Sequence, residues 1–363
     1  DGLSPEDDDG VTNVYVKDTA TGAVTLASRA DGAAGEPAHQ DCSDAALSAN
    51  GARVAFVCDG PLAPADANAH EDVYLRDLGT GRTDLVSRAT GLGATGDSSS
   101  LEPAIDATGS HVAFASFASN LTPVALPGSK RVYRRELLNG GTTVLVSRAT
   151  GAGGAVPAAD RSEDPSISGD GARVAFTTEG GAQLDPADTN GRDDVYVRDV
   201  PAAQTVLVSR ADGAGQVGNG DSGDAAISGN GQFVAFTSRS TQFDNANDPT
   251  PDPDAYRRSL TSGATQLLSI TAAGAKADGP ATVASIDDSG ETVAFRTAAT
   301  NLDPADTTAA LTDIYVRRGN EMLLASRADG AGGAPINGVD LGAAVSGDGS
   351  RVVFAAATGL VAG

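Results

Sequence analysis

The sequence predicts an all-β protein, a six-bladed β-propeller with four antiparallel strands in each blade. Three short patterns each recur six times along the 363 residues, with 57 to 63 residues between neighbouring copies. A recurrence this regular predicts a repeat architecture, and four to eight four-stranded units can close into a propeller. The patterns are a pentad such as VYVRD around every tyrosine (Tyr15, Tyr74, Tyr133, Tyr196, Tyr256, Tyr315), a VAF or VVF triplet (ending at Phe56, Phe114, Phe176, Phe236, Phe295, Phe354) and an LxSRA-like run (Ser28, Ser87, Ser147, Ser209, Ser269, Ser326).

One complete copy, residues 164–211, contains the four predicted strands in order. The first is PSIS, and the glycine-rich turn Gly169 to Gly171 connects it to the second, RVAFT. Gly and Asp suit such a turn because they tolerate positive φ. The polar loop LDPADTNGRD precedes the third strand, VYVRD, and the turn PAAQ precedes the fourth, TVLVSR. The alternating side chains of these strands predict that Tyr and Phe pack between neighbouring blades.

The two ends of the sequence predict how the last blade is built. The chain begins with strands of the third and fourth type and ends with strands of the first and second type. We therefore expect a single domain over residues 1–363 in which both termini complete one blade, so that no sheet edge is left open. The predicted blades are residues 44–88, 103–148, 165–210, 225–270 and 283–327, with the closing blade at 343–357 plus 13–29.

The composition limits the classes of partner. The net charge is −23, which disfavours binding to the phosphates of nucleic acids and favours solubility. No apolar run is long enough to cross a bilayer, and no charged and apolar leader precedes Asp1, so we expect no membrane insertion and an already processed chain. The scarcity of Lys beside abundant Ala, Gly and Arg is typical of high-GC bacterial sequences.

The two cysteines, Cys42 and Cys58, flank a predicted hairpin centred near Asn50. Residues whose numbers sum to about 100 then face each other, so the two thiols lie at disulfide distance. A disulfide would indicate an extracellular or periplasmic location. The alternative is two free thiols that face each other by accident of register.

The motif S-x-D-G-x-x-V-A-F, present as SGDGARVAF and SGDGSRVVF and followed by V-Y-V-x-D, resembles the repeat of TolB-like six-bladed β-propellers. The resemblance covers essentially the whole chain. It implies the propeller fold but no single function, since propellers of this kind serve as protein-binding modules, as gating domains of peptidases and as secreted proteins.

Several enzyme motifs are disfavoured. Two G-x-G-x-x-G matches, from Gly91 and Gly213, open no helix and so predict flexible loops and not a dinucleotide site. The three histidines, His39, His70 and His111, lack metal-ligand spacing and are expected at the surface or on strands. Sialidase-like hydrolysis is disfavoured because the chain has no Trp and every Tyr is repetitive.

Acidic loops before the third strand form a candidate calcium site. Asp and Asn oxygens at this spacing suit Ca²⁺, although no closing Glu follows, and the same residues cap turns without any metal. Both interpretations stay open, so the sequence requires no cofactor and leaves calcium as the one candidate. The loops contain Asp66, Asn68 and Asp72 in one copy and Asp188, Asn190 and Asp194 in another, with related residues at Asp7, Asp9 and Asn13 and at Asp248, Asp252 and Asp254.

A second candidate site consists of carboxylates that each lie three residues before an apolar residue of the first strand. They are Asp44, Glu102, Asp164 and Asp224, and the fifth and sixth copies lack them. In a propeller this position lies near the mouth of the central channel, so the four acids predict an incomplete acidic collar that would hold a cation or a basic peptide. The alternative is that they cap backbone groups at the strand starts.

From these patterns the sequence predicts a monomeric, non-catalytic binding or scaffold module of a secreted or periplasmic bacterial protein. The expected partner is a protein or peptide, bound through the loop face or the central channel, and not a nucleic acid. The alternative is a calcium-dependent propeller enzyme, either a hydrolase or a lyase.

Overall fold

The computed structural model describes residues 3–4, 6–7, 9–124, 128–138, 140–157, 161–244, 248–307, 311–328, 333–336 and 342–355. Residues 356 and 357 of the predicted closing blade lie outside these ranges. Within them the regular structure consists of β-strands and one short 3-10 helix, η1 (Gly181–Gln183). The all-β prediction is confirmed.

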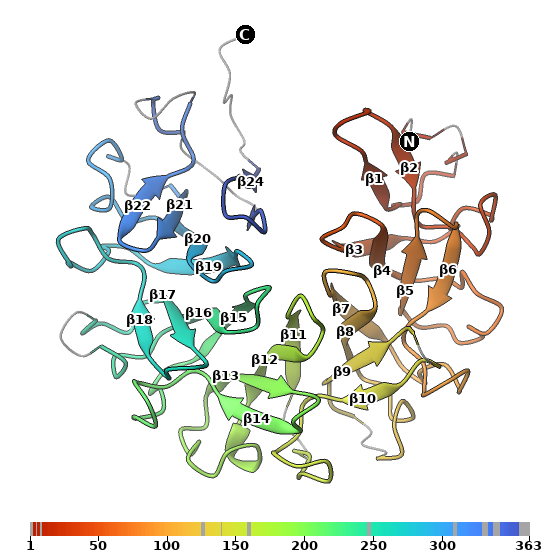
Figure 1. The fold of residues 1–363 in the computed structure, drawn as a ribbon, viewed down its shortest axis with the longest axis horizontal. Helices are drawn as coiled ribbons and strands as arrows, with labels where there is room; N and C mark the ends of the chain where they lie inside the picture. The colour runs from red at the N-terminus through yellow and green to blue at the C-terminus, as the bar shows by residue number, and fades with distance from the viewer. Residues whose placement is uncertain are drawn as a thin grey trace. The chain divides into compact units, whose positions relative to one another are not determined.

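The strands form five four-stranded sheets and two two-stranded sheets, each an antiparallel meander in chain order (Figure 1). The four-strand unit predicted for each complete copy is therefore confirmed. Two-stranded sheets occur where the sequence has half copies, at β1 (Tyr15–Lys17) and β2 (Val24–Leu26) and at β23 (Ala343–Val345) and β24 (Val352–Phe354).

The other strands have the following bounds. The first two complete sheets contain β3 (Cys42–Leu47), β4 (Arg53–Cys58), β5 (Asp72–Asp77), β6 (Arg82–Leu85), β7 (Ser100–Ile105), β8 (His111–Ser116), β9 (Arg131–Glu136) and β10 (Thr143–Leu145). The next three contain β11 (Ser162–Ile167), β12 (Arg173–Glu179), β13 (Asp193–Asp199), β14 (Gln204–Leu207), β15 (Ser222–Ile227), β16 (Phe233–Ser238), β17 (Asp254–Ser259), β18 (Thr265–Leu267), β19 (Ala281–Ile286), β20 (Thr292–Thr297), β21 (Asp313–Arg318) and β22 (Glu321–Leu324).

The chain divides into two compact units. The first contains residues 1–148, 153–174 and 200–202, and the second contains residues 149–152, 175–199 and 203–363. In the described part of the chain no helix is long and apolar enough to span a membrane.

The aromatic residues build the core inside each unit. Phe and Tyr on neighbouring strands of one sheet stack, as Phe114 and Tyr133 do at 5.9 Å between ring centroids. Their face packs on the Val and Ala face of the preceding sheet, where Val57 and Val73 are buried in the same cluster. The predicted role of Tyr and Phe between blades is therefore confirmed in the first unit, and the cluster around Phe236 and Tyr256 repeats it in the second.

A buried arginine from the tyrosine pentad ties each four-stranded sheet to the loop that precedes it. The Arg135 guanidinium on β9 donates hydrogen bonds to the carbonyl oxygens of Arg88, Ala89 and Gly91, at 2.7–3.1 Å, and to Thr143 Oγ1 at 2.7 Å. These carbonyls belong to the loop between β6 and β7. Arg76, Arg198, Arg258 and Arg317 bond corresponding carbonyls. The polar backbone of the inter-sheet loops is thereby satisfied without water.

The hairpin of β3 and β4 places Cys42 opposite Cys58, and a disulfide joins them. The two Cα atoms are 4.1 Å apart. The two ends of this hairpin lead into a pocket that residues 36–40 and 60–62 line.

Candidate functional site

A polar side chain closes the loop before the first strand in three copies. Asp97 Oδ1 accepts a hydrogen bond from Ser119 N at 2.6 Å, and Asp278 Oδ1 accepts one from Thr300 N at 2.7 Å. Asn219 Oδ1 does the same with the backbone of Thr241 at 3.0 Å. Each contact links this loop to the loop that leaves the second strand.

The copy with the disulfide cannot make this contact. Ala38 N donates to Ser28 O, and in the next copy Gly96 N donates to Ser87 O, so Ala38 and Gly96 are equivalent. The residue after each is then also equivalent, and His39 takes the place of Asp97. On the other loop, Pro61 occupies the position of Ser119. Proline has no N–H to donate.

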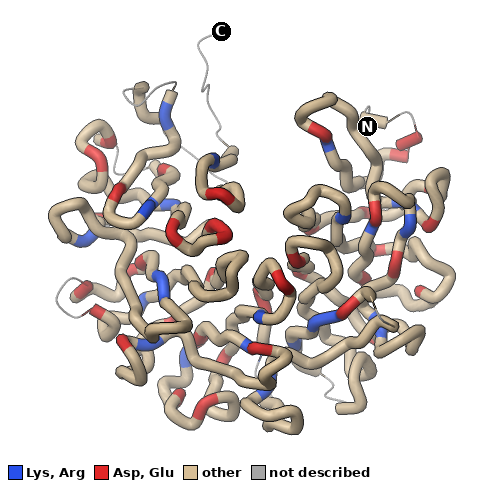
Figure 2. The backbone as a smooth tube through the Cα atoms, in the orientation of Figure 1, with Lys and Arg blue, Asp and Glu red and all other residues tan. Residues whose placement is uncertain are grey.

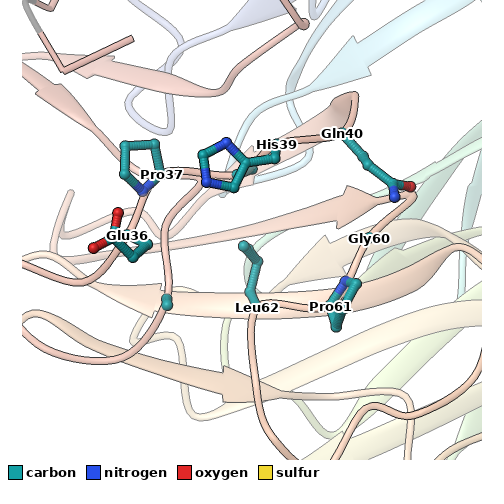
Figure 3. Close-up of a pocket in the computed structure, with 9 residues that line it drawn as sticks. Glu36, Pro37, His39, Gln40, Gly60, Pro61 and Leu62 are labelled. Carbon is teal, nitrogen blue, oxygen red and sulfur yellow. The ribbon is translucent and has the colours of Figure 1, made fainter. Parts of the chain in front are cut away.

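A pocket of about 270 Å³ opens between these two loops (Figure 3). Leu62 is buried and lies with Pro61 on one side, while Glu36, Pro37 and His39 lie on the other. The pocket residues are Ala30, Glu36, Pro37, Ala38, His39, Gln40, Gly60, Pro61 and Leu62. An apolar wall with a few polar side chains is typical of small-molecule sites.

His39 carries the most versatile chemistry in this pocket. Its Nδ1 lies 2.9 Å from Asp9 Oδ2, while most of the ring is exposed. The hydrogen bond with His39 is the main cause that lowers the pKa of Asp9, so this carboxylate is ionised at neutral pH and can only accept. The Nδ1–H of His39 therefore donates to Asp9, and Nε2 is left as the basic nitrogen. The expectation of a surface position for His39 is correct, but that position borders a pocket.

The predicted calcium loops are internally hydrogen-bonded. Asp194 Oδ2 accepts from Asn190 Nδ2 at 2.6 Å, and Asp188 Oδ2 accepts from the Tyr196 hydroxyl at 2.6 Å. Burial is the main cause that raises the pKa of Asp194 to about 8.

The copy with Asp66, Asn68 and Asp72 repeats these contacts. Asn68 Nδ2 donates to Asp72 Oδ2 at 2.7 Å, and the Tyr74 hydroxyl donates to Asp66. Burial raises the pKa of Asp72 to about 7. Among the described residues, no three His, Cys, Asp or Glu side chains converge as a metal-binding group.

The four predicted collar residues share an unusual backbone conformation. Asp44, Glu102, Asp164 and Asp224 have φ between 49° and 56°. The register of the first two strands shifts beside Asp44, Glu102 and Asp224. Such bulges redirect a side chain within a strand, and Asp tolerates this conformation better than most residues.

Only two of the collar residues are joined by a described contact within one unit. Glu102 Oε2 accepts a hydrogen bond from Asp164 N at 2.9 Å. Asp44 lies in the same unit and Asp224 in the other. Figure 2 shows acidic positions throughout the chain and not at these strands alone.

A cluster of charges around Lys130 was not predicted from the sequence. The buried Lys130 ammonium contacts Glu102, and it lies 3.1 Å from Glu163 Oε2. Arg161 Nη2 lies 2.9 Å from the other Glu163 oxygen. Lys130 could have been noticed as one of only three lysines and the only one in its position among the six copies.

Comparison with solved structures gives matches at low identity. An oligogalacturonate lyase in complex with manganese matches over 96% of this chain and 78% of its own, with 12% identity and a TM-score of 0.51. A putative TolB from Agrobacterium tumefaciens matches over 86% and 89%, with 12% identity and a TM-score of 0.46. TolB from Acinetobacter baumannii matches over 85% of this chain, with 12% identity and a TM-score of 0.43, and the chain spans 57% of its length. No protein-family model and no curated protein matches the chain.

These matches correct one expectation and confirm another. The prediction of a non-catalytic binding or scaffold module is wrong, because the matched structures include an enzyme, the lyase, over nearly the whole chain. The enzyme alternative is the better supported of the two. The resemblance expected from the repeat motif is confirmed for the fold, and the chain has the fold of a TolB-like β-propeller.

Proposed function

We propose that this chain is a propeller enzyme, a hydrolase that uses His39 as a general base. The observation that carries the proposal is the hydrogen bond of 2.9 Å between His39 and Asp9 at the edge of a pocket. In three other copies a polar side chain closes the corresponding loops. A residue that recurs in all copies has a structural role in each of them. We therefore expect a single catalytic site at residues that one copy alone contains.

The pair supplies general-base chemistry. Asp9 holds the Nδ1–H tautomer of His39 and stabilises the imidazolium that forms when Nε2 takes a proton from water. His is suited to this step because its charge changes near neutral pH. The hydroxide equivalent then attacks an electrophilic carbon bound in the pocket, and the imidazolium returns the proton to the leaving group.

The pocket limits the substrate. About 270 Å³ holds one small group and not an extended polymer. Leu62, Pro37 and Pro61 favour an apolar portion, and Glu36 together with the net charge of −23 disfavours anions. We therefore expect a neutral or cationic ester, amide or glycoside with a small apolar group.

Two further parts of the proposal concern the whole chain. We propose that β1–β2 and β23–β24 form the sixth blade together, because each provides the strand types that the other lacks. By the register of the complete copies, Val353 on β24 would face Val16 on β1, so cysteines at both positions should cross-link spontaneously. An extracellular or periplasmic location is also proposed, because the Cys42–Cys58 disulfide is stable in an oxidising compartment.

The test of the catalytic proposal is turnover of a panel of chromogenic esters, amides and glycosides by the wild type and by His39→Ala. We expect the substitution to lower kcat by about 100-fold or more, and Asp9→Asn to lower kcat while shifting the pH profile. His70→Ala is the matched control, since His70 is an exposed histidine of the adjacent copy. Equal activity of H39A and the wild type, or no turnover by the folded wild type, would overturn the proposal.

A further inference from the structure

The loop before the third strand repeats one arrangement of buried acids. The hydroxyl of the pentad tyrosine donates to a first acid, which lies eight or nine residues before that tyrosine. A serine hydroxyl donates to a second side chain, which lies two residues before the same tyrosine. The first acids are Asp7, Asp66, Asp188, Asp248 and Asp306, and the second positions in the same copies are Asn13, Asp72, Asp194, Asp254 and Asp313. Copies with two acids therefore bury two carboxylates side by side.

The copy that contains β15–β18 places a cation between its two carboxylates. Lys276 Nζ lies 2.5 Å from Asp248 Oδ1 and 2.7 Å from Asp254 Oδ2, and both aspartates are fully buried. Thr250 adds its hydroxyl at 2.6 Å and its carbonyl oxygen at 3.4 Å. Four oxygens thus surround one ammonium. The exposed Asp252 is not part of this arrangement, so the loop spacing expected from the sequence is corrected to Asp248, Thr250 and Asp254.

The first copy avoids the second carboxylate. Asn13 replaces it and donates from Nδ2 to Asp7 Oδ1 at 3.2 Å. One acid and one amide need no cation. This substitution also leaves Asp9 available for the contact with His39.

The copy that contains β11–β14 has both carboxylates, and no Lys or Arg of the described residues forms an ion pair with them. Asp188 and Asp194 are 1% and 0% exposed, and the contacts described for them are with neutral donors. Asp188 Oδ1 has no hydrogen-bond partner among the described residues. Val217 takes the position of Lys276 in this copy. Val217 forms an isolated backbone β-bridge with Arg210, and Lys276 forms the same bridge with Ile270.

We propose that a calcium ion binds between Asp188 and Asp194, at the position that the Lys276 ammonium takes in the other copy. Buried carboxylates require a compensating charge, and two of them match a divalent cation. By correspondence with Thr250, Asn190 supplies its carbonyl oxygen, and its side-chain oxygen after the amide rotates. The rotation exchanges the hydrogen bonds of Nδ2 with Asp194 and Gly218, and that of Oδ1 with Arg192 N, for coordination of the ion. Oxygen-only ligands completed by water suit Ca²⁺, so a closing Glu is not needed.

A second calcium site of the same kind lies at Asp66, Asn68 and Asp72. These residues have the same spacing as Asp188, Asn190 and Asp194, and Thr95 takes the position of Lys276. The competing solution for both sites is one proton shared by each pair of carboxylates, which the experiment separates from calcium binding.

The experiment measures calcium stoichiometry and Tm on the full chain after EDTA treatment and dialysis, with MgCl2 as comparator. In the wild type, CaCl2 should bind and raise Tm by on the order of 3–5 °C at saturation. Val217→Lys brings an ammonium to the site and should lower the stoichiometry by one calcium per chain. Lys276→Thr opens the third site and should raise it by one. Val206→Lys, at an exposed position on the same sheet, controls for added charge and should change nothing.

The proposal is overturned if CaCl2 neither binds to the wild type nor changes its Tm, which would favour the shared proton. It is also overturned if folded V217K keeps the full stoichiometry. Should V217K fail to fold by far-UV circular dichroism, Asp188→Asn takes its place with the same expected loss of one calcium. Retention of that calcium by D188N would equally refute the site. None of these outcomes depends on the activity proposed for His39.

Discussion

Replacing Arg135 with methionine tests how the loops between sheets are held. The Arg135 side chain is 4% exposed and makes four hydrogen bonds, three to carbonyls of the preceding loop and one to Thr143. Methionine has a similar length and no donor. The substitution therefore leaves the three carbonyls without their partner.

Two opposing effects set the magnitude. The hydrogen bonds favour the charged side chain in the folded state, while burial opposes it and lowers the pKa of Arg135 to about 10. In R135M the three carbonyl oxygens lose their donor, at a cost of about 1 kcal/mol or more each. R135M should therefore lower the free energy of unfolding by about 3 kcal/mol.

Urea denaturation followed by far-UV circular dichroism measures this loss, because the chain has no Trp for fluorescence. Hydrogen exchange should accelerate at the amides of residues 88–95, the loop that Arg135 holds. Arg135→Lys keeps the charge but not the forked geometry and should fall between R135M and the wild type.

Arg82→Met is the matched control. Arg82 is 67% exposed and pairs with Asp84 across the surface, so its loss should change the unfolding free energy by less than about 1 kcal/mol. The argument is refuted if R135M unfolds at the same urea concentration as R82M and its loop exchanges at the wild-type rate.

Three further results follow from the structure. Replacing both Cys42 and Cys58 with Ser should lower the unfolding free energy by about 3 kcal/mol, because the disulfide spans a sequence separation of 16; equal urea midpoints would contradict this. Burial alone would raise the pKa of Asp106, but hydrogen bonds from His111 and Ser110 outweigh it and lower that pKa. The stability that this carboxylate contributes is present above its unfolded pKa and is lost as pH falls through the lower folded pKa. On acidification from about pH 5 to about pH 2, the Asp106→Asn variant should therefore lose less free energy of unfolding than the wild type. Ala203 has a φ of 53°, and Ala203→Gly should raise stability by about 1 kcal/mol, measured by Tm, since glycine adopts this conformation without strain.

Local patterns explain why much of the fold could be predicted. Strand type depends on alternation and turn chemistry within about 50 residues, and six copies of the same pattern reduce the error of any one. Cys42 and Cys58 face each other because the Asn50 turn sets the register of one hairpin. The spacing of Asp188, Asn190 and Asp194 likewise predicts the loop geometry that Asp66, Asn68 and Asp72 share. The same pattern of acidic residue types selects Asp252 and misses Thr250, which is the residue that contacts Lys276.

The His39 pocket could not be predicted because it depends on two loops from different parts of a copy. Only the folded chain shows that Pro61 faces the position of His39 and lacks the N–H that Ser119 donates elsewhere. Asp9 reaches His39 from 30 residues away. The Lys130 cluster likewise joins Glu102 on β7 and Glu163 on β11 through a lysine that precedes β9.

The sequence by itself determined the all-β class, the repeated four-stranded unit and the packing of Tyr and Phe between sheets, because these depend on short-range periodicity that the copies share. The tertiary structure decided which departures from the repeat meet in space. Charge compensation and loop closure are properties of side chains brought together from distant segments, and the spacing of residues along one strand does not contain them.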